Sequence, residues 1–317
     1  MKIIQFPHPG NEHVYSKVEL ASGLKNWNSN KCHARNFIRA NGFYVDSNGK
    51  LNQDSLTFWG EWEAPANMFN LNYTSGTDMP RHIIEPHSVS SIKAPIPRQM
   101  NSDPLVFGKH FKYAICRQNQ RSITMKNLCP GSIILFGCVR GTKFLLDTVF
   151  VVGDYKKQFS LSNANSLSDI DEFTEYKKLV LDTFFFKSFK NSSQKFCRLS
   201  VKEHKVINGC SCKNLTKINQ STLNTYYEGA SFANPFKTPN GDIYSFVPAK
   251  VYDSNNLGFA RLALDTKKDF KELHYKNLQN FYMVKDESAS EIKAFWDRLC
   301  NATEKTGLVK AVCFPYP

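Results

Sequence analysis

The chain has few of the features that mark membrane or secreted proteins. Its longest apolar stretches, 133–138 and 144–152, have the length of β-strands and fall short of the about 18 residues that a membrane-spanning helix needs. The apolar part of residues 1–8 is also too short for a signal peptide. We therefore expect a cytoplasmic protein without a membrane partner.

Several motifs of nucleotide-dependent and nucleophilic enzymes are also missing. The sequence contains no Gly-rich phosphate loop, no G-x-S-x-G nucleophile elbow and no G-x-G-x-x-G dinucleotide fingerprint. These absences disfavour ATP-driven and serine-hydrolase chemistry.

Paired cysteines with metal-ligand spacing are scarce. The nine cysteines are an odd number scattered along the chain, as is typical of reduced thiols in a cytosol. Cys210 and Cys212 form the one close pair, and a zinc site there would need two more ligands, for which His204 is the nearby candidate. The spacing favours a plain loop over a zinc site. The cofactor stays unknown, and a divalent metal stays open.

Aromatic residues, in contrast, are abundant. They make up 13% of the 317 residues and include 25 Phe, which is typical of β-rich packing. The pattern along the chain predicts an α+β protein. We expect a β-rich domain at 1–153, a connection and helix at 154–194, and a mixed α/β domain at 195–317.

Turn and strand signals organise the first half of the chain. Residues 3–6 predict a strand, and 36–63 predict a meander with turns at Asn41-Gly42 and Asn48-Gly49. Six prolines in 64–104 predict a long irregular loop, and loops of that length are often functional.

A β-hairpin formed by 132–138 and 143–152 is the clearest element. Strict alternation would place one set of residues of its second strand on a common face: Phe144, Leu146, Thr148, Phe150 and Val152. Asp147 would then lie on the other face among aliphatic neighbours. Such an acid is either hydrogen-bonded for structure or shifted in pKa for function.

The second half alternates helix and strand signals. After a connection at 153–171, apolar spacing predicts a helix over 171–187. A capping box from Ser288 to Glu291 predicts the start of another helix, which Gly307 ends. Three further segments read as strands: 242–247, 258–264 and 308–314.

Two carboxylates lie one residue apart between tryptophans in Phe58-Trp59-Gly60-Glu61-Trp62-Glu63. If this segment is extended, Glu61 and Glu63 point to one face and repel each other. Each then needs a cation, a metal, a shared proton or a ligand. This pattern predicts catalytic carboxylates at Glu61 and Glu63, with Trp59 and Trp62 as substrate-binding walls.

Histidines precede this segment in two places. His8 and His13 flank Pro9-Gly10, a backbone that forbids the helical histidine spacing of zinc proteases but leaves either imidazole available as a general acid or base. His33 and Arg35 are candidate substrate-binding residues. Arg35 could bind a phosphate, or it could pair with Glu61 or Glu63, which would neutralise the acids without any substrate.

Much of the formal net charge of +13 is concentrated in 81–143, where ten Lys and Arg stand against two acids. Such a segment attracts polyanions, although lysine-rich surfaces also serve solubility alone. Phe107, Phe111 and Tyr113 are interleaved with cations here, a composition that fits nucleotide binding but also fits core packing. The predicted substrate-binding residues of this region are Asp103, Lys109, Lys112, Arg117 and Arg121.

Two resemblances add context. A Glu-x-Glu pair after an arginine resembles the ADP-ribosyltransferases, which implies glycosyl-type transfer at the glutamates. The segments FPHPGNEH, FWGEWE, DPLVFG, GSIILFGC and FLLDTVFVV together resemble an uncharacterised group of bacterial proteins associated with mobile or defence islands. That second resemblance covers mainly 1–152, implies a nucleotide or nucleic-acid context, and carries no catalytic residue with it.

The sequence as a whole predicts an enzyme that acts on a nucleotide or nucleic acid by carboxylate- and histidine-assisted hydrolysis or glycosyl transfer. The alternative is a non-catalytic module that binds a nucleotide signal or nucleic acid, in bacterial anti-phage defence. A buried Arg35 pair with one of the glutamates would point to scaffolding at that place.

Overall fold

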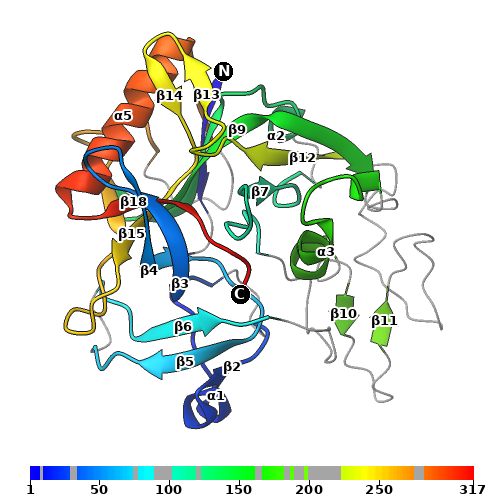
Figure 1. Ribbon diagram of the computed structural model, residues 1–317, viewed down its shortest axis with the longest axis vertical. Coiled ribbons are helices and arrows are strands. Elements are labelled where there is room, and N and C mark those ends of the chain that lie inside the picture. The colour runs from blue at the N-terminus through cyan, green and yellow to red at the C-terminus, as the bar shows by residue number, and fades with distance from the viewer. Residues whose placement is uncertain are drawn as a thin grey trace.

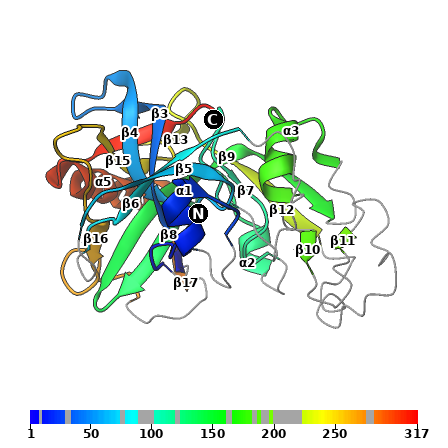
Figure 2. The ribbon, with the colours of Figure 1, turned by 90° about the horizontal axis from the view of Figure 1, so that it is seen from below.

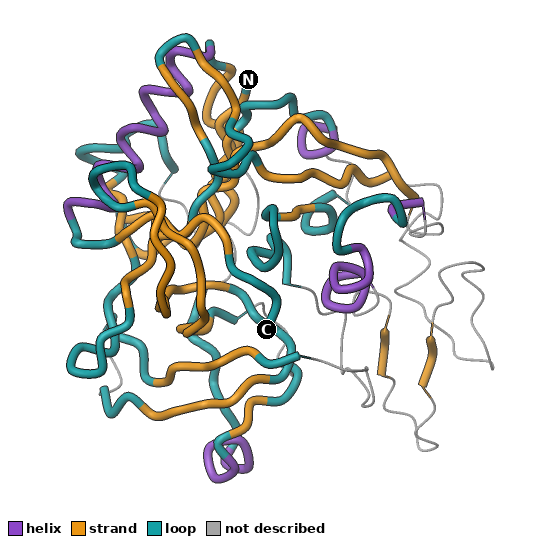
Figure 3. The backbone as a smooth tube through the Cα atoms, in the orientation of Figure 1, coloured by secondary structure: helices purple, strands orange, loops and turns teal. Residues whose placement is uncertain are grey.

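The computed structural model describes residues 1–7, 10–28, 34–73, 78–88, 102–118, 123–160, 166–181, 186–188, 196–198, 223–274 and 282–317. The fold is α+β, with two large sheets and helices at the periphery (Figure 3). Several residues discussed above lie outside the described ranges: His8, His33, Arg121, His204, Cys210 and Cys212.

The first sheet has seven strands in the order β17-β1-β8-β9-β12-β7, with β16 also paired to β9. β1 and β8 are parallel, and the other pairs are antiparallel. Its strands are β1 (Lys2–Pro7), β7 (Lys112–Tyr113), β8 (Ile133–Arg140), β9 (Lys143–Ser160), β12 (Leu223–Gly229), β16 (Leu262–Asp265) and β17 (Tyr282–Asp286).

The second sheet has the order β18-β15-β4-β3-β6-β5-β2, and β18 also pairs with β3. The pairings β3–β4–β15–β18–β3 therefore close into a small cylinder. Its strands are β2 (Leu24–Lys25), β3 (Asn36–Val45), β4 (Leu51–Gly60), β5 (Ala66–Asn70), β6 (His82–Pro86), β15 (Val247–Val251) and β18 (Val309–Cys313).

The helices are short except for the last. They are α1 (Lys17–Ser22), α2 (Ile123–Lys126), α3 (Phe173–Tyr176), which continues as the π-helix η2 (Lys177–Leu181), and α5 (Ala289–Lys305). α3 and α5 lie at opposite sides of the molecule (Figures 1 and 2). Two small hairpins complete the described elements: β10 (Phe186–Ser188) with β11 (Phe196–Arg198), and β13 (Phe236–Thr238) with β14 (Gly241–Ile243). None of the described helices combines the length and apolarity that crossing a bilayer would demand.

Apolar side chains fill two main clusters. The larger one packs residues of the second sheet, such as Ile38 and Phe58, with residues of the first, such as Phe136 and Phe150. The other joins the opposite face of the first sheet to α5, where Trp296 is one of its buried residues. The first sheet is therefore covered on both faces, which explains the continuous apolar runs of β8 and β9.

A β-bulge in β9 overturns the predicted alternation of that strand. Phe136 pairs with Thr148, but the next residue, Gly137, pairs with Leu146, so Asp147 is the extra residue. Before the bulge, Phe144 and Leu146 join the cluster that reaches α5; after it, Phe150 and Val152 join the cluster between the sheets. The predicted common face was wrong because the bulge shifts the side-chain parity.

Other expectations for the first half also change. Asn41-Gly42 is not a turn but lies within β3, where a Cβ on Gly42 would come 2.9 Å from the Cys313 carbonyl oxygen. Glycine at position 42 allows the backbones of β3 and β18 to approach closely. Asn48-Gly49 forms the predicted turn, with φ +77° at Gly49. The stretch 64–104 contains the strands β5 and β6, because its prolines lie mostly outside them.

The second half confirms some elements and shortens others. α5 begins at the predicted capping box of Ser288 and Glu291, and Gly307 follows its end with φ +74°. The predicted helix at 171–187 spans only α3 and η2, and β9 runs to Ser160 through the predicted connection.

Strands from the two ends of the chain are mixed in space. β15 and β18 complete the sheet of β3 and β4, while β12, β16 and β17 join the sheet of β1, β8 and β9. A division into domains at 1–153 and 195–317 is not confirmed.

Candidate functional site

The Trp-Glu segment leaves the strand at its first glutamate. β4 ends at Gly60, so Glu61 to Pro65 form a loop between β4 and β5. Glu61 and Glu63 therefore lie beyond the strand, so the condition of a strand running through both acids is not met. The two acids have different neighbours.

Glu61 belongs to a buried ionic cluster that also contains Arg35 and Asp147. Arg35 Nη1 donates to Glu61 Oε2 at 2.6 Å, and the side chains of both residues are 2% exposed. Arg35 Nε lies 2.7 Å from Asp147 Oδ2, an ion pair whose angles fall outside those of a hydrogen bond. Although burial alone lowers the pKa of Arg35, Asp147 and Glu61 raise it above its ordinary value, so the guanidinium stays charged.

Arg261 adds a second cation to this cluster. Its Nε lies 3.7 Å from Asp147 Oδ1, its Nη1 is 3.0 Å from the Cys138 sulfur, and its guanidinium lies over the Trp59 ring at 4.7 Å from the centroid. The charges of Arg35 and Arg261 balance those of the two carboxylates. Arg35 is thus paired with acids of the protein, as the scaffolding alternative predicts. Trp59 packs on Arg261, and its Nε1 donates to the Phe259 carbonyl.

Lys25, a fully buried lysine on β2, binds the backbone of the loop after β4. Lys25 Nζ donates to the carbonyls of Asn26, Glu63 and Ala64 at 3.1, 3.0 and 2.7 Å. Burial lowers the pKa of Lys25 to about 7, against the opposing effect of Glu63. The lysine therefore fixes the backbone of the loop that carries Trp62.

Further hydrogen bonds hold the Glu61 to Pro65 loop. Asn36 Nδ2 donates to the Trp62 carbonyl at 3.0 Å, Trp62 Nε1 to the Pro65 carbonyl at 3.1 Å, and the Glu63 amide to Ser102 Oγ at 3.2 Å. The position of the Trp62 indole is consequently set before any ligand arrives.

His13 is buried, and its backbone amide donates to the Arg35 carbonyl at 2.8 Å. Its ring packs edge-on against Tyr15 at 4.5 Å, and its Nδ1 has no hydrogen-bond partner among the described residues. Burial, followed by the charge of Lys25, lowers the pKa of His13 to about 4, so the imidazole is neutral at pH 7.

Asp103 has a structural environment. Its carboxylate accepts hydrogen bonds from the backbone amides of Ala114, Ile115 and Cys116 at 3.1, 2.8 and 2.7 Å. Burial raises the pKa of Asp103 to about 6 in spite of these bonds. The side chain thus orders the backbone of residues 114–116.

Part of the basic segment is paired with neighbouring acids. Lys109 pairs with Asp171 at 3.1 Å, and the buried Lys112 pairs with Glu172 at 2.9 Å. Arg117 has a left-handed backbone, with φ +63°. The interleaved aromatics Phe107, Phe111 and Tyr113 lie in the core between the sheets, as their alternating positions favoured.

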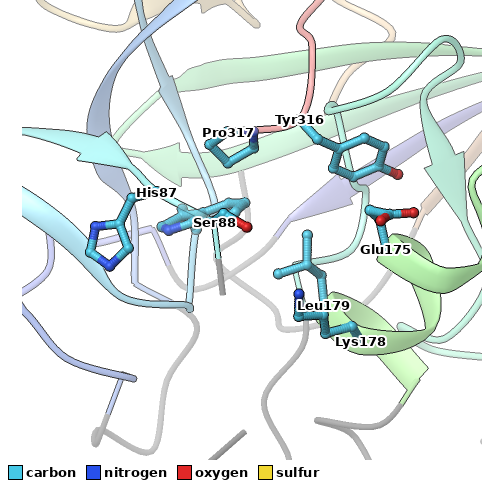
Figure 4. Close-up of a pocket in the computed structure, with 8 residues that line it drawn as sticks. His87, Ser88, Glu175, Lys178, Leu179, Tyr316 and Pro317 are labelled. Carbon is cyan, nitrogen blue, oxygen red and sulfur yellow. The ribbon is translucent and has the colours of Figure 1, made fainter. Parts of the chain in front are cut away.

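A pocket with a cavity volume of about 30 Å³, partly open to solvent, lies beside Trp62. Figure 4 shows Glu175, Lys178 and Leu179 on one side, from α3 and η2, with His87 opposite. Tyr316, three residues after β18, closes the wall. The lining is Trp62, His87, Ser88, Glu175, Lys178, Leu179, Tyr316 and Pro317.

Of the sequence-predicted site residues, Trp62 alone among the described ones lines this pocket. Glu61, Arg35 and Trp59 form the buried cluster, while Glu63, His13 and Asp103 are held elsewhere. Sequence analysis missed Glu175, Lys178 and Tyr316 because α3 carries no distinctive motif and Tyr316 follows a strand. Within the described ranges, no three His, Cys, Asp or Glu side chains converge as metal ligands.

Comparison with protein-family models, with curated proteins and with solved structures gave no match. The case for a function therefore depends on the side chains of this chain.

Proposed function

We propose that the protein binds a nucleotide or a base of a nucleic acid at the pocket beside Trp62. The observation that carries the proposal is the combination of two partly exposed rings, His87 and Tyr316, with Lys178 around one small pocket above the fully buried Trp62. Nucleobases stack on aromatic rings while ammonium groups contact phosphates. The net charge of +13 supports an anionic partner in the same way.

The pocket is small and open. Its cavity volume is about 30 Å³, far below the range of roughly 300–1,000 Å³ that is usual for enclosed small-molecule sites, so a base would lie across its mouth rather than inside it. The pinned loop under Trp62 favours binding, because a wall that is already ordered loses little entropy when the ligand arrives.

Calorimetric titration with the four ribonucleoside monophosphates and a short single-stranded oligonucleotide tests the proposal. Lys178→Ala should weaken binding by about tenfold, as expected for loss of a charge-assisted contact. Lys177→Ala is the matched control, because Lys177 is the adjacent lysine on η2 and does not line the pocket. Absence of binding by the wild type, or equal losses in both variants, would contradict the proposal.

Catalysis at the same pocket is the second candidate. His87 and Glu175 place an imidazole and a carboxylate on one pocket, the pair of groups that hydrolysis or glycosyl transfer uses for proton transfer. If the protein is an enzyme, Glu175→Gln should abolish turnover of a bound nucleotide substrate. Wild-type protein that binds nucleotides for hours without changing them, as judged by chromatography, would leave binding as the function.

A further inference from the structure

The helix α1 has its polarity reversed relative to an ordinary surface helix. Glu19 is its buried residue, and the carboxylate accepts hydrogen bonds from the Ser16 amide, the Ser16 hydroxyl and the Asn26 amide at 2.8, 2.8 and 3.0 Å. Val18 and Leu20, on either side of Glu19, are 73% and 49% exposed. A surface helix normally turns its apolar face to the core and its charges to water. The outer face of α1 is therefore apolar, and the described residues leave it uncovered.

Two flanking residues extend this apolar surface. Val14 precedes the N-cap of α1 by two residues and is 64% exposed, and Leu24 follows the C-cap and is 48% exposed. These residues form a surface that we call the α1 patch: Val14, Val18, Leu20 and Leu24. α1 lies at one end of the longest axis of the molecule (Figure 1), and the view from below in Figure 2 looks onto it. The α1 patch is thus a projecting tip of the protein.

The charges at this tip suit an anionic surface. Lys17 and Glu19 are the charged residues between positions 14 and 24. Lys17 is exposed, whereas Glu19 is turned inward. The net charge of +13 adds a long-range attraction to the same kind of surface.

The size and charge of the α1 patch disfavour a second copy of this chain as its partner. A stable protein–protein interface uses about 20–30 residues on each side, whereas the patch offers four aliphatic side chains on a projecting tip. Two copies that met here would also bring their exposed Lys17 side chains and their net positive charges together. A lipid bilayer, in contrast, takes up apolar side chains without a complementary groove.

We propose that α1 and its flanking residues dock the protein on the surface of an anionic lipid bilayer. The aliphatic side chains of the α1 patch enter the boundary between headgroups and acyl chains, and Lys17 contacts lipid phosphate groups. Docking of this kind needs no membrane-spanning helix. It replaces the expectation of a protein without a membrane partner, and it is independent of nucleotide binding.

Co-sedimentation of the full chain with lipid vesicles tests the proposal. The wild type should bind vesicles of phosphatidylglycerol and phosphatidylcholine in equal parts. Leu20→Ser should weaken this binding by roughly tenfold, because its strength scales with the apolar area that enters the bilayer. Leu223→Ser is the matched control and should change nothing, because Leu223 is also 49% exposed but lies on β12 in the first sheet.

Lys17→Gln provides a second variant, which tests the charge. It should weaken binding to the mixed vesicles by roughly fivefold and leave binding to pure phosphatidylcholine vesicles unchanged. Equal binding of the wild type and both α1 variants would assign the attraction to the charge of the whole protein and overturn the proposal, as would absence of wild-type binding. A dimer without vesicles, detected by light scattering and lost in Leu20→Ser, would overturn it in favour of a second copy.

Discussion

Arg35 Nε lies 2.7 Å from Asp147 Oδ2. Asp147 is the extra residue of the β-bulge in β9, opposite Phe136 and Gly137 of β8. Bulges commonly redirect a side chain, and this one places a carboxylate beside a guanidinium that already holds Glu61. Glu61 of the twin-acid motif is thus paired with Arg35, the described contacts of Glu63 are made by its backbone, and the pocket beside Trp62 is left as the candidate for binding.

Removing the charge of Arg35 should destabilise the protein strongly. Arg35→Met leaves Glu61 and Asp147 buried close to each other without their shared cation, which should lower the free energy of unfolding by about 3–5 kcal/mol. Urea denaturation followed by circular dichroism measures this. Lys109→Met removes an exposed pair with Asp171 and should change stability little. An Arg35→Met protein as stable as the wild type would show that the cluster is not a scaffold.

The bulge should tolerate no side chain at Gly137. A Cβ there would lie 2.1 Å from the Leu145 carbonyl oxygen, a backbone atom that cannot move without disturbing β9. We expect Gly137→Ala to cost about 3 kcal/mol or more in thermal or chemical denaturation. Gly141→Ala, in the adjoining turn, meets open space and should cost only about 1 kcal/mol, from its φ of +59°. Similar costs at both positions would contradict the described register.

His13 should make stability fall in acid. Its pKa is about 4 in the folded protein and 6.5 in the unfolded chain, so the unfolded chain binds more protons between these values. Stability is complete above pH 6.5 and is lost as the pH falls toward 4, by roughly 2–3 kcal/mol. The His13→Gln variant has no imidazole to protonate and does not lose this stability. The difference in free energy of unfolding between wild type and variant should therefore shrink from pH 7 to pH 4. A constant deficit would contradict a buried, neutral His13.

Asp103 should act in the opposite direction. Its pKa is about 6 when folded and 3.8 when unfolded, so the folded state binds the extra proton in this window. The stability that the folded protein gains from this proton is fully present below pH 3.8 and is lost as the pH rises through 6. Asp103→Asn should therefore show a larger deficit at pH 4 than at pH 7, measured by urea unfolding at both values. A deficit that grows with pH would mean that the hydrogen bonds from the backbone amides stabilise the charged carboxylate by more than burial destabilises it.

Local signals in the sequence predicted the elements that depend on local chemistry. The capping box at Ser288 fixed the start of α5, and the apolar runs around Arg140-Gly141-Thr142 indicated the β8–β9 hairpin. The strand parity of β9 failed at Asp147, because a bulge depends on what the strand faces and leaves no trace in local periodicity.

Long-range contacts explain the site residues that sequence analysis misplaced. Lys25 binds the backbone carbonyl of Glu63, and the pocket joins Trp62 to Glu175 and Tyr316, which lie more than 100 and 250 positions later in the chain. Such convergence follows from β15 and β18 closing the second sheet onto β3 and β4. The Glu-x-Glu spacing predicted a counter-charge or ligand for each acid, and tertiary structure supplies Arg35 for Glu61.

A crystal structure of the protein with a ribonucleoside monophosphate is the most direct test of the central claim, that the pocket beside Trp62 receives a nucleotide. The account predicts the nucleotide at the mouth of this pocket, against Tyr316 and Lys178, with the Arg35–Glu61 pair unchanged. Nucleotide bound at the Arg35 cluster in place of its carboxylates, or an empty pocket at saturating nucleotide, would contradict it.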